Sequence, residues 1–357
     1  MLIESAKLVA LVTKIFVELK VNHSDAREVA EHLVLANLKG HDSHGVGMVP
    51  TYVSNITRKK CNVNAKGKLI LDKGAIMLFD ADRGLGQIAG RAATDIAINR
   101  VRETGLVCMG IRNCHHLGRI GAYAERCGKE GYLAIHFVNV VGHDPLVAPF
   151  GGKESRLGTN PFCCVIPRKD GNDIILDMAT SAIAHGKVRV AHMKGNTEVP
   201  EGALIDHLGK PTQNPSVMFE EPLGSMLPFG DHKGYGLALI CELLAGGLAG
   251  KWTAAQKSQE EGGFNIINHM LMFVIDPSIF DENESFQTEV ENMVEYLYSA
   301  TPTQENSNVM LPGEPEINTL SSREIRGIPI NENSWEALKQ AAKDCGISDN
   351  EIQELLA

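Results

Sequence analysis

Hydrophobic residues near both ends of the chain recur with the spacing of helices. From Leu8 to Leu19 the apolar positions are three or four residues apart, which is typical of one face of a helix. A second helix is predicted over 26–38, because Ser24 can cap its start and Gly40 can end it. Further helical patterns cover 282–299, 334–342 and 350–356. We therefore expect both ends to be helical and to pack together as one layer.

The middle of the chain has a different pattern, in which short apolar runs alternate with helical stretches. The runs predict strands at 69–71, 76–79, 106–111, 133–138, 162–166, 174–176 and 270–275. Helices are predicted over 87–102, 119–130 and 235–248. This alternation is typical of a mixed α/β fold. We expect an N-terminal helical part (1–65), a central α/β region that binds the ligands (66–270), and a C-terminal part (271–357) that returns to the N-terminal helices.

Composition and charge exclude several classes of protein. The 357 residues are 43% hydrophobic and 22% charged, as in a soluble globular protein with two or three cores. The formal net charge of −10 is the wrong sign for binding nucleic acid or anionic lipid. The longest apolar run, 237–249, contains Glu242 and is too short to span ~30 Å of hydrocarbon. The eight cysteines include no C-x-x-C pair and are interpreted as reduced thiols. We expect a cytoplasmic protein without nucleic-acid or membrane partners.

Five residues after the second predicted helix concentrate groups that can exchange protons. His41, Asp42, Ser43, His44 and Gly45 follow one another. A histidine exchanges a proton near neutral pH, and Asp42 could hold its ring in one tautomer. A capped turn with solvated histidines explains the pentapeptide alone equally well.

A second pair of histidines, His115 and His116, follows an apolar strand, where α/β folds place functional loops. Adjacent residues of an extended segment point to opposite sides, so at most one of the two rings joins a given site. A metal site is the minor interpretation, since no H-E-x-x-H motif is present. A metal-dependent lyase that uses His41, His44, His115 and His116 remains the alternative from a different class.

Two glycine-containing turns could contact an anionic ligand. Gly84 to Gly90 has the spacing G-x-G-x-x-x-G, one residue away from the dinucleotide fingerprint of Rossmann folds, and a tight turn before a helix is the simpler interpretation. Lys233 opens the apolar helix, where its ammonium and free backbone N–H groups could meet an anion. Close helix packing at Gly234 and Gly236 explains that segment equally well.

Taken together, the motifs resemble the type-2 malate/L-lactate dehydrogenase family, closest to its hydroxycarboxylate dehydrogenase B branch. They are Asp42-Ser43-His44-Gly45, the turn 82–86, His116-x-Gly118, Gly158-Thr159-Asn160-Pro161, Leu176 to Ser181, and His232-Lys233-Gly234-Tyr235-Gly236. The segments 143–150, 156–163 and 311–314 add to the resemblance. It implies an α/β, non-Rossmann nicotinamide-binding fold with a mixed central sheet and a helical layer built from both termini. Gly84 to Gly90 is then structural.

The resemblance also implies roles for individual residues. His44 is the expected proton donor and acceptor at the substrate oxygen, and His116, Thr159 and Asn160 lie near the substrate. The expected cofactor-binding residues are Gly118, Arg119, Ile120, Leu176, Asp177, Met178, Ala179, Thr180, His232, Lys233, Asn268, Leu311, Pro312, Gly313 and Glu314. No metal is implied. The cofactor is expected in a cleft shared by the two subunits of a homodimer.

The chain departs from the family pattern at the substrate pocket. Met48 stands where many relatives have an arginine that can bind the substrate carboxylate. Arg119 and Arg156 are the candidates to replace it. We expect an NAD-dependent dehydrogenase, with NADP as the alternative cofactor, that acts on a small 2-hydroxy or 2-oxo acid. Malate is the first substrate expected, and aryl or lactate-like 2-oxo acids and cyclic imino acids are the alternatives.

Overall fold

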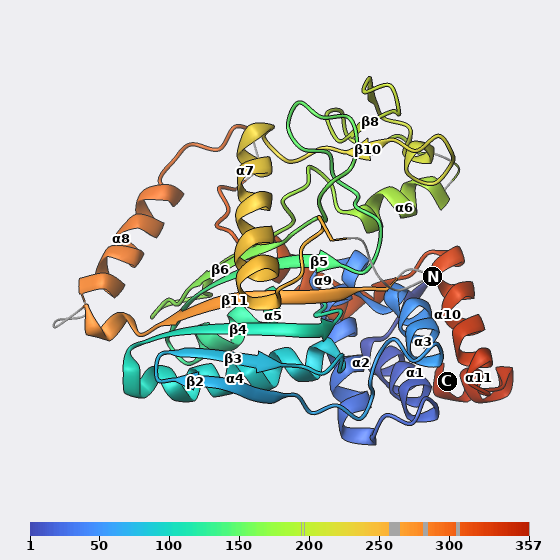
Figure 1. Ribbon diagram of the computed structural model, residues 1–357, viewed down its shortest axis with the longest axis horizontal. Coiled ribbons are helices and arrows are strands. Elements are labelled where there is room, and N and C mark those ends of the chain that lie inside the picture. The colour runs from blue at the N-terminus through green and yellow to red at the C-terminus, as the bar shows by residue number, and fades with distance from the viewer. Residues whose placement is uncertain (194, 196, 257–264, 281–284, 305–307, 357) are drawn as a thin grey trace.

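A computed structural model describes residues 1–193, 195, 197–256, 265–280, 285–304 and 308–356. A helical layer lies beside a central sheet, and a smaller unit that contains short strands lies above them (Figure 1). No helix among the described residues is long and apolar enough to cross a membrane.

The central sheet has seven strands in the order β2-β3-β4-β11-β5-β6-β7. They are β2 (Lys68–Lys73), β3 (Ile76–Asp80), β4 (Leu106–His115), β5 (Leu133–Val141), β6 (Phe162–Ile166), β7 (Ile174–Met178) and β11 (Ile267–Ile275). β3 and β4 run parallel, and the other neighbours are antiparallel. The sheet is therefore mixed, and β11 joins it from a distant part of the chain.

Helices cover both faces of this sheet. On one face, α4 (Gly86–Thr104) and α5 (Gly121–Lys129) pack on buried strand residues such as Met109 and Met272. On the other face lie α7 (His232–Cys241) and its π-helical continuation η4 (Glu242–Gly250), which contacts β4, β5 and β11. Figure 1 shows α7 in front of the sheet. A sheet buried on both faces explains why its central strands are nearly continuous apolar runs.

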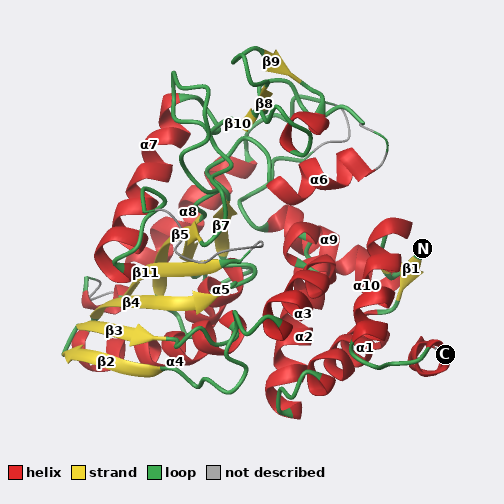
Figure 2. Ribbon diagram, turned by 45° about the vertical axis from the view of Figure 1, so that its right-hand side comes forward, coloured by secondary structure: helices red, strands yellow, loops and turns green. Residues whose placement is uncertain are grey.

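The helical layer contains segments from both ends of the chain (Figure 2). Its helices are α1 (Ser5–Glu18), α2 (His23–Leu38), α3 (Val49–Thr57), α9 (Glu314–Arg326), α10 (Glu332–Asp344) and α11 (Asp349–Leu356). Leu11 and Ile15 of α1 share one core with Leu338 and Ile352. β1 (Leu2–Ile3) also pairs with β12 (Ile328–Pro329). The predicted layer of both termini is confirmed.

A smaller unit packs above the sheet and has its own core, which includes Val147, Val188, Leu204 and Met226. Its elements are α6 (His185–Met193), β8 (Leu204–Ile205), β9 (Pro211–Thr212), η3 (Pro215–Met218) and β10 (Ser225–Met226). Outside it, η5 (Pro277–Ile279) leads toward α8 (Ser285–Tyr298), where Glu291 binds Arg168 at 2.6 Å.

The expected α/β class and non-Rossmann sheet are confirmed, and every predicted strand coincides with an observed one. The helices α6 and α9 were not predicted, and α3 falls within the part (1–65) that was expected to be helical. The division of the chain at 65 and 270 stays a prediction, and its second boundary falls within β11.

Candidate active site

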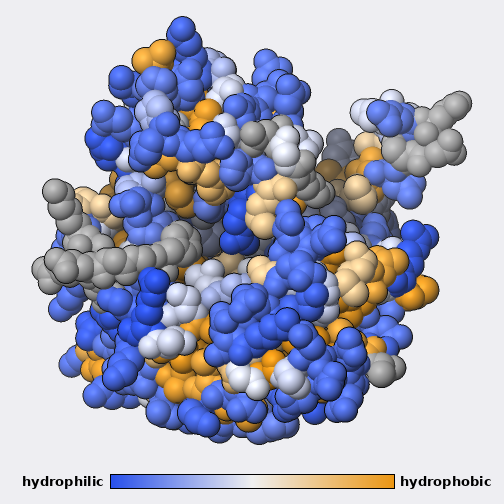
Figure 3. Space-filling view, turned by 90° about the vertical axis from the view of Figure 1, so that its right-hand side faces the viewer, coloured by the Kyte–Doolittle hydropathy of each residue, from blue (hydrophilic) through white to orange (hydrophobic). Residues whose placement is uncertain are grey.

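A cavity of about 1130 Å³ opens where the helical layer, the sheet and the smaller unit meet. Seen from the side of the helical layer, the surface is hollowed between that layer and the smaller unit above it (Figure 3). Its lining includes predicted residues from all along the chain: His44, Met48, His116, Gly118, Ile120, Thr159, Ala179 and Asn268. The fold therefore brings together the motifs that the sequence singled out.

His44 lies in a short 3₁₀ turn, η1 (Asp42–His44), which is followed by η2 (Val46–Met48). Asn37 of α2 donates from Nδ2 to Asp42 Oδ1 (2.7 Å) and accepts from Val46 N at Oδ1 (2.8 Å). Arg323 of α9 donates to both Asp42 oxygens (2.7 and 3.1 Å). The turn is thus anchored to two helices of the layer.

Gly45 allows this anchoring. A Cβ at this position would lie 2.1 Å from the Asn37 side-chain oxygen. Any side chain would therefore displace the amide that holds the turn. The D-S-H-G motif is explained by this contact and by the double anchor on Asp42.

The partner of the His44 ring is Ser43 rather than the expected Asp42, whose carboxylate is engaged by Asn37 and Arg323. Ser43 Oγ lies 2.9 Å from His44 Nδ1. Burial lowers the pKa of His44 to about 4, although the Asp177 carboxylate acts in the opposite direction. The ring is therefore neutral near pH 7.

His116 stacks on His44, with the ring centroids 5.5 Å apart and an interplanar angle of 19°. Behind it, Gln87 Nε2 donates to the Tyr52 hydroxyl oxygen (2.8 Å), which lies 2.7 Å from His116 Nδ1. Because Gln87 donates to this oxygen, the Tyr52 proton is available for His116 Nδ1 or, at 3.4 Å, for His116 O; the first arrangement leaves the ring proton on Nε2. Burial lowers the pKa of His116, so the ring is neutral. With the ring proton on Nε2, His116 can act as a hydrogen-bond donor toward the cavity.

The two adjacent histidines have different environments. His115 is buried, and its Nε2 lies 3.0 Å from Asn55 Nδ2. His116 lines the cavity and His115 does not. Among the residues that the structure describes, no group of three or more His, Cys, Asp or Glu side chains is placed to hold a metal ion.

Two further predicted residues, Asn160 and Asn268, belong to hydrogen-bond networks around the cavity. Asn160 is buried and donates to Glu242 Oε2 of η4 (2.7 Å). Asn268 accepts from Leu117 N (2.9 Å) and donates to Asn139 O (3.0 Å). Asn268 thereby holds the segment that follows His116 against β5 and β11.

A second cavity, of about 320 Å³, is lined in part by the chain segments 118–120 and 175–179, which also contribute to the first cavity. It is lined by Arg119, Asp177 and Gly313 of the predicted set. Arg119 is buried and binds Glu125 (2.7 Å), and its Nη1 lies 3.8 Å from Asp177. The guanidinium is therefore neutralised by carboxylates and faces this cavity.

Seven of the fifteen predicted cofactor residues line one of the two cavities, and two chain segments contribute to both. The segment 118–120 contributes to both, because Gly118 and Ile120 line the first and Arg119 lines the second. The segment 175–179 does the same, with Ala179 in the first and Asp177 in the second. Next to it, Pro312 O accepts from Ile175 N (3.0 Å) and Leu311 N donates to Glu314 Oε2 (2.7 Å). The segment 311–314 therefore borders the second cavity.

Some predicted residues lie elsewhere. Arg156 is exposed and paired with Glu154, and His232 and Lys233 are exposed at the start of α7. Leu176, Met178 and Thr180 belong to β7 and its end, where Thr180 Oγ1 donates to Thr159 O (3.0 Å). None of these six residues lines either cavity.

The sequence did not indicate three residues that the structure places here. Tyr52 and Gln87 are buried behind His116, in helices whose patterns predict only packing. Arg189 lines the large cavity from α6, a helix of nine residues that the hydrophobic pattern did not predict.

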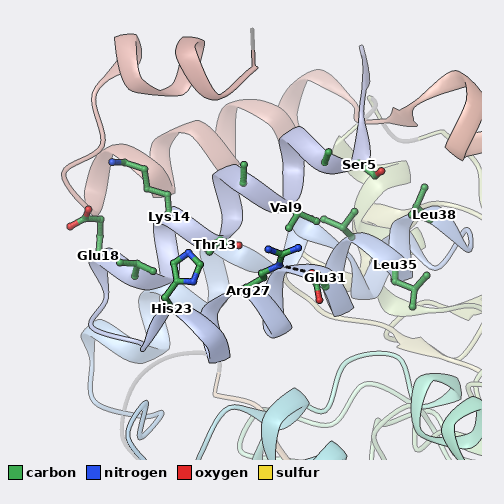
Figure 4. Close-up of a pocket in the computed structure, with 14 residues that line it drawn as sticks. Ser5, Val9, Thr13, Lys14, Glu18, His23, Arg27, Glu31, Leu35 and Leu38 are labelled. Atoms are coloured by element: carbon green, nitrogen blue, oxygen red, sulfur yellow. Dashed lines mark hydrogen bonds and ion pairs between the residues drawn. The ribbon is translucent and has the colours of Figure 1, made fainter.

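A third cavity lies away from this site, in a groove on α1 and α2 (Figure 4). Val9, Leu35 and Leu38 contribute to its apolar lining, and Arg27 and Glu31 pair with each other at 2.8 Å. No residue of the predicted site lines this groove.

Comparisons with known proteins agree with the fold and the motifs. Residues 3–339 match the family model described as malate/L-lactate dehydrogenase. Hydroxycarboxylate dehydrogenase B of Escherichia coli (strain K12) is 42% identical over 98% of this chain and 96% of its own. L-lactate dehydrogenase of Cupriavidus necator is 38% identical over 90% of this chain and 92% of its own. The solved sulfolactate dehydrogenase of Methanocaldococcus jannaschii superposes with a TM-score of 0.86, at 31% identity and 99% coverage of both chains. The chain belongs to the malate/L-lactate dehydrogenase family.

Proposed function

We propose that the protein transfers a hydride between a nicotinamide cofactor and a 2-hydroxy or 2-oxo acid, with malate and oxaloacetate as the first pair to test. The observation that carries this proposal is the cavity wall on which His44 and His116 stack beside the expected cofactor segments. The two rings offer a proton-exchanging group and a hydrogen-bond donor at one place.

His44 would move the proton at the substrate oxygen. In oxidation of the hydroxy acid, its neutral ring accepts the hydroxyl proton, and in reduction the protonated ring returns it. The bound nicotinamide supplies or accepts the hydride. Ser43 Oγ orients the ring at Nδ1, and His116 would donate from Nε2 to the same oxygen or to the carboxylate beside it. Thr159 and Asn268 would complete the polar part of the lining.

The second cavity favours NAD over NADP. Four carboxylates line it: Glu125, Asp173, Asp177 and Glu316. Three cations also line it, of which Lys39 and Arg119 already bind Glu125, at 2.6 and 2.7 Å, and Lys129 is the third. A carboxylate can accept hydrogen bonds from ribose hydroxyls but repels a 2′-phosphate. We therefore expect the adenosine end of NAD in this cavity.

A second candidate substrate class is favoured by the apolar part of the large cavity. Met48, Met218, Phe219 and Leu223 line it. His192 stacks on Phe219 at 4.7 Å between centroids, which holds that ring in place. An aryl 2-oxo acid could bury its ring against these side chains. The lactate-like acids and the cyclic imino acids remain alternatives.

A homodimer in the cytoplasm is the expected state of the protein. α7 and η4 bury Ala238, Cys241 and Ala245 but also expose apolar side chains. Leu239, Ile240, Leu243 and Leu248 are 37–66% exposed. A helix that is apolar on all sides is normally covered, so we propose a second copy of the chain on this face.

A substrate panel tests the proposed function. Pyruvate, oxaloacetate, phenylpyruvate and a cyclic imino acid would each be mixed with NADH or NADPH, and the absorbance of the reduced nicotinamide would be followed. We expect turnover of at least one 2-oxo acid, faster with NADH, and unchanged by a chelator. Turnover that a chelator abolishes, without any change in the nicotinamide, would favour the metal-dependent lyase.

A further inference from the structure

The position of Arg189 is set by a close contact between α6 and the turn that carries His44. A Cβ at Gly186 would lie 2.4 Å from Ser43 Cβ, so only glycine allows this approach. Arg189 follows three residues later and lies on the same side of the helix. Its Nη2 is 4.0 Å from the place that a Cβ of Gly47 would occupy. The guanidinium is therefore beside η2, the turn that contains Met48.

Arg189 has no hydrogen-bond or ion-pair partner within the described part of the chain, unlike the arginines predicted from the sequence. Arg119 binds Glu125 and Arg156 binds Glu154. Burial lowers the pKa of Arg189, and no carboxylate offsets this effect. A partly buried cation without a partner is unfavourable, and an anion in the cavity would stabilise it.

The remaining charges of the cavity point to a single carboxylate site. Among the described residues that line it, Arg189 is the one Lys or Arg, and Asp144 is the one carboxylate. Burial also lowers the pKa of His185 to about 4, so this neighbouring ring is neutral near pH 7. A guanidinium can bind both oxygens of a carboxylate through parallel hydrogen bonds.

We propose that Arg189 binds the carboxylate adjacent to the reacting carbon of the substrate, in place of the arginine that Met48 does not supply. This assignment rests on the proposed function, since it presumes a 2-oxo acid in the cavity. It places the cation on the smaller unit, opposite the helical layer that carries His44. Arg189 is then the residue that selects acids over uncharged carbonyl compounds.

Arg189→Met tests the assignment, because methionine keeps most of the apolar stem and removes the charge. We expect KM for phenylpyruvate to rise roughly ten- to a hundredfold, the effect of losing a charge-assisted hydrogen bond. KM for its methyl ester and Kd for NADH should change by less than about twofold. An unchanged KM for the acid, or an equal rise for acid and ester, would overturn the proposal.

Two variants serve as controls. Lys187→Met removes an exposed cation from the same helix, and its kinetics should match the wild type. Arg189→Lys keeps the charge but loses the planar fork, so KM for the acid should rise less than in Arg189→Met. If the methionine variant does not fold, a selective rise for the acid in the lysine variant supports the proposal, and equal values for acid and ester contradict it.

Comparison of substrates identifies the carboxylate. If Arg189 binds the carboxylate beside the reacting carbon, Arg189→Met should raise KM for pyruvate and KM for oxaloacetate by similar factors. A rise in KM confined to oxaloacetate would mean that Arg189 binds the distal carboxylate, and the assignment would be wrong. Failure of the proposed function is distinguishable, because the wild type would then reduce no 2-oxo acid with either nicotinamide.

Discussion

His44 is the residue on which the proposed chemistry depends. His44→Gln should lower kcat by roughly 10²–10⁴-fold, which is the usual contribution of a positioned acid or base. Kd for NADH and the melting temperature should stay close to the wild type, because the anchors of the turn are Asp42, Asn37 and Arg323. Steady-state kinetics with a thermal melt would check this. A variant that keeps half of the wild-type kcat would exclude His44 as the proton carrier.

The low pKa of His44 predicts opposite pH dependences for the two directions. With a pKa of about 4, the ring of the free enzyme is neutral from roughly pH 5 to pH 8. Oxidation needs the neutral ring, so its kcat/KM should be flat over this interval. Reduction needs the protonated ring, so its kcat/KM should fall about tenfold per pH unit as pH rises. A plateau for reduction up to pH 6 would show an ordinary histidine pKa instead.

Gly45 is predicted to be intolerant of any side chain. Gly45→Ala places a methyl group 2.1 Å from the Asn37 oxygen, so we expect a loss of roughly 1–3 kcal/mol in the free energy of unfolding, as in other overpacked sites. Gly47→Ala is the matched control, since the nearest atom to its Cβ is 4.0 Å away. Denaturant unfolding of both variants would check this, and equal stabilities would contradict the steric argument.

At the scale of elements, α9 should affect catalysis without contacting substrate. Its Arg323 binds both oxygens of Asp42, which connects the helix to the turn of His44. Arg323→Leu should therefore lower kcat several-fold and cost about 1–3 kcal/mol of stability, because Asp42 loses a bidentate partner. Arg326→Leu, on an exposed position of the same helix, is the control. The expectation fails if both variants behave alike.

The elements also show how far the hydrophobic pattern could predict the fold. Helices such as α1 and strands such as β5 have strong periodicity because a core faces them, and both were predicted. α9 has no fully buried residue, and α6 is short and buries only Val188, so few buried apolar positions mark either element. Arg189 lies on one of these elements. The role proposed for it could therefore not be inferred from the pattern.

Contacts between distant segments were predictable only through the family resemblance. The insertion of β11 between β4 and β5 brings Asn268 beside the segment that follows His116, and no local pattern encodes that insertion. The hydrogen bonds from Gln87 through Tyr52 to His116 likewise join residues up to 64 positions apart in the sequence. Such contacts depend on the tertiary fold.

At the scale of the whole molecule, the exposed face of α7 and η4 predicts the assembly. Ile240 and Leu243 are 47% and 51% exposed although the same helix buries its other side on the sheet. The double variant Ile240→Glu/Leu243→Glu should place two charges in the proposed interface and yield a monomer in sedimentation experiments, because buried unpaired charges are strongly unfavourable. Ile325→Glu is the control, since Ile325 is 88% exposed on α9, away from this face.

If the cofactor lies between subunits, the monomer should also bind NADH more weakly and turn over more slowly. A double variant that remains dimeric would place the interface elsewhere, and a fully active monomer would show that one chain forms the complete site.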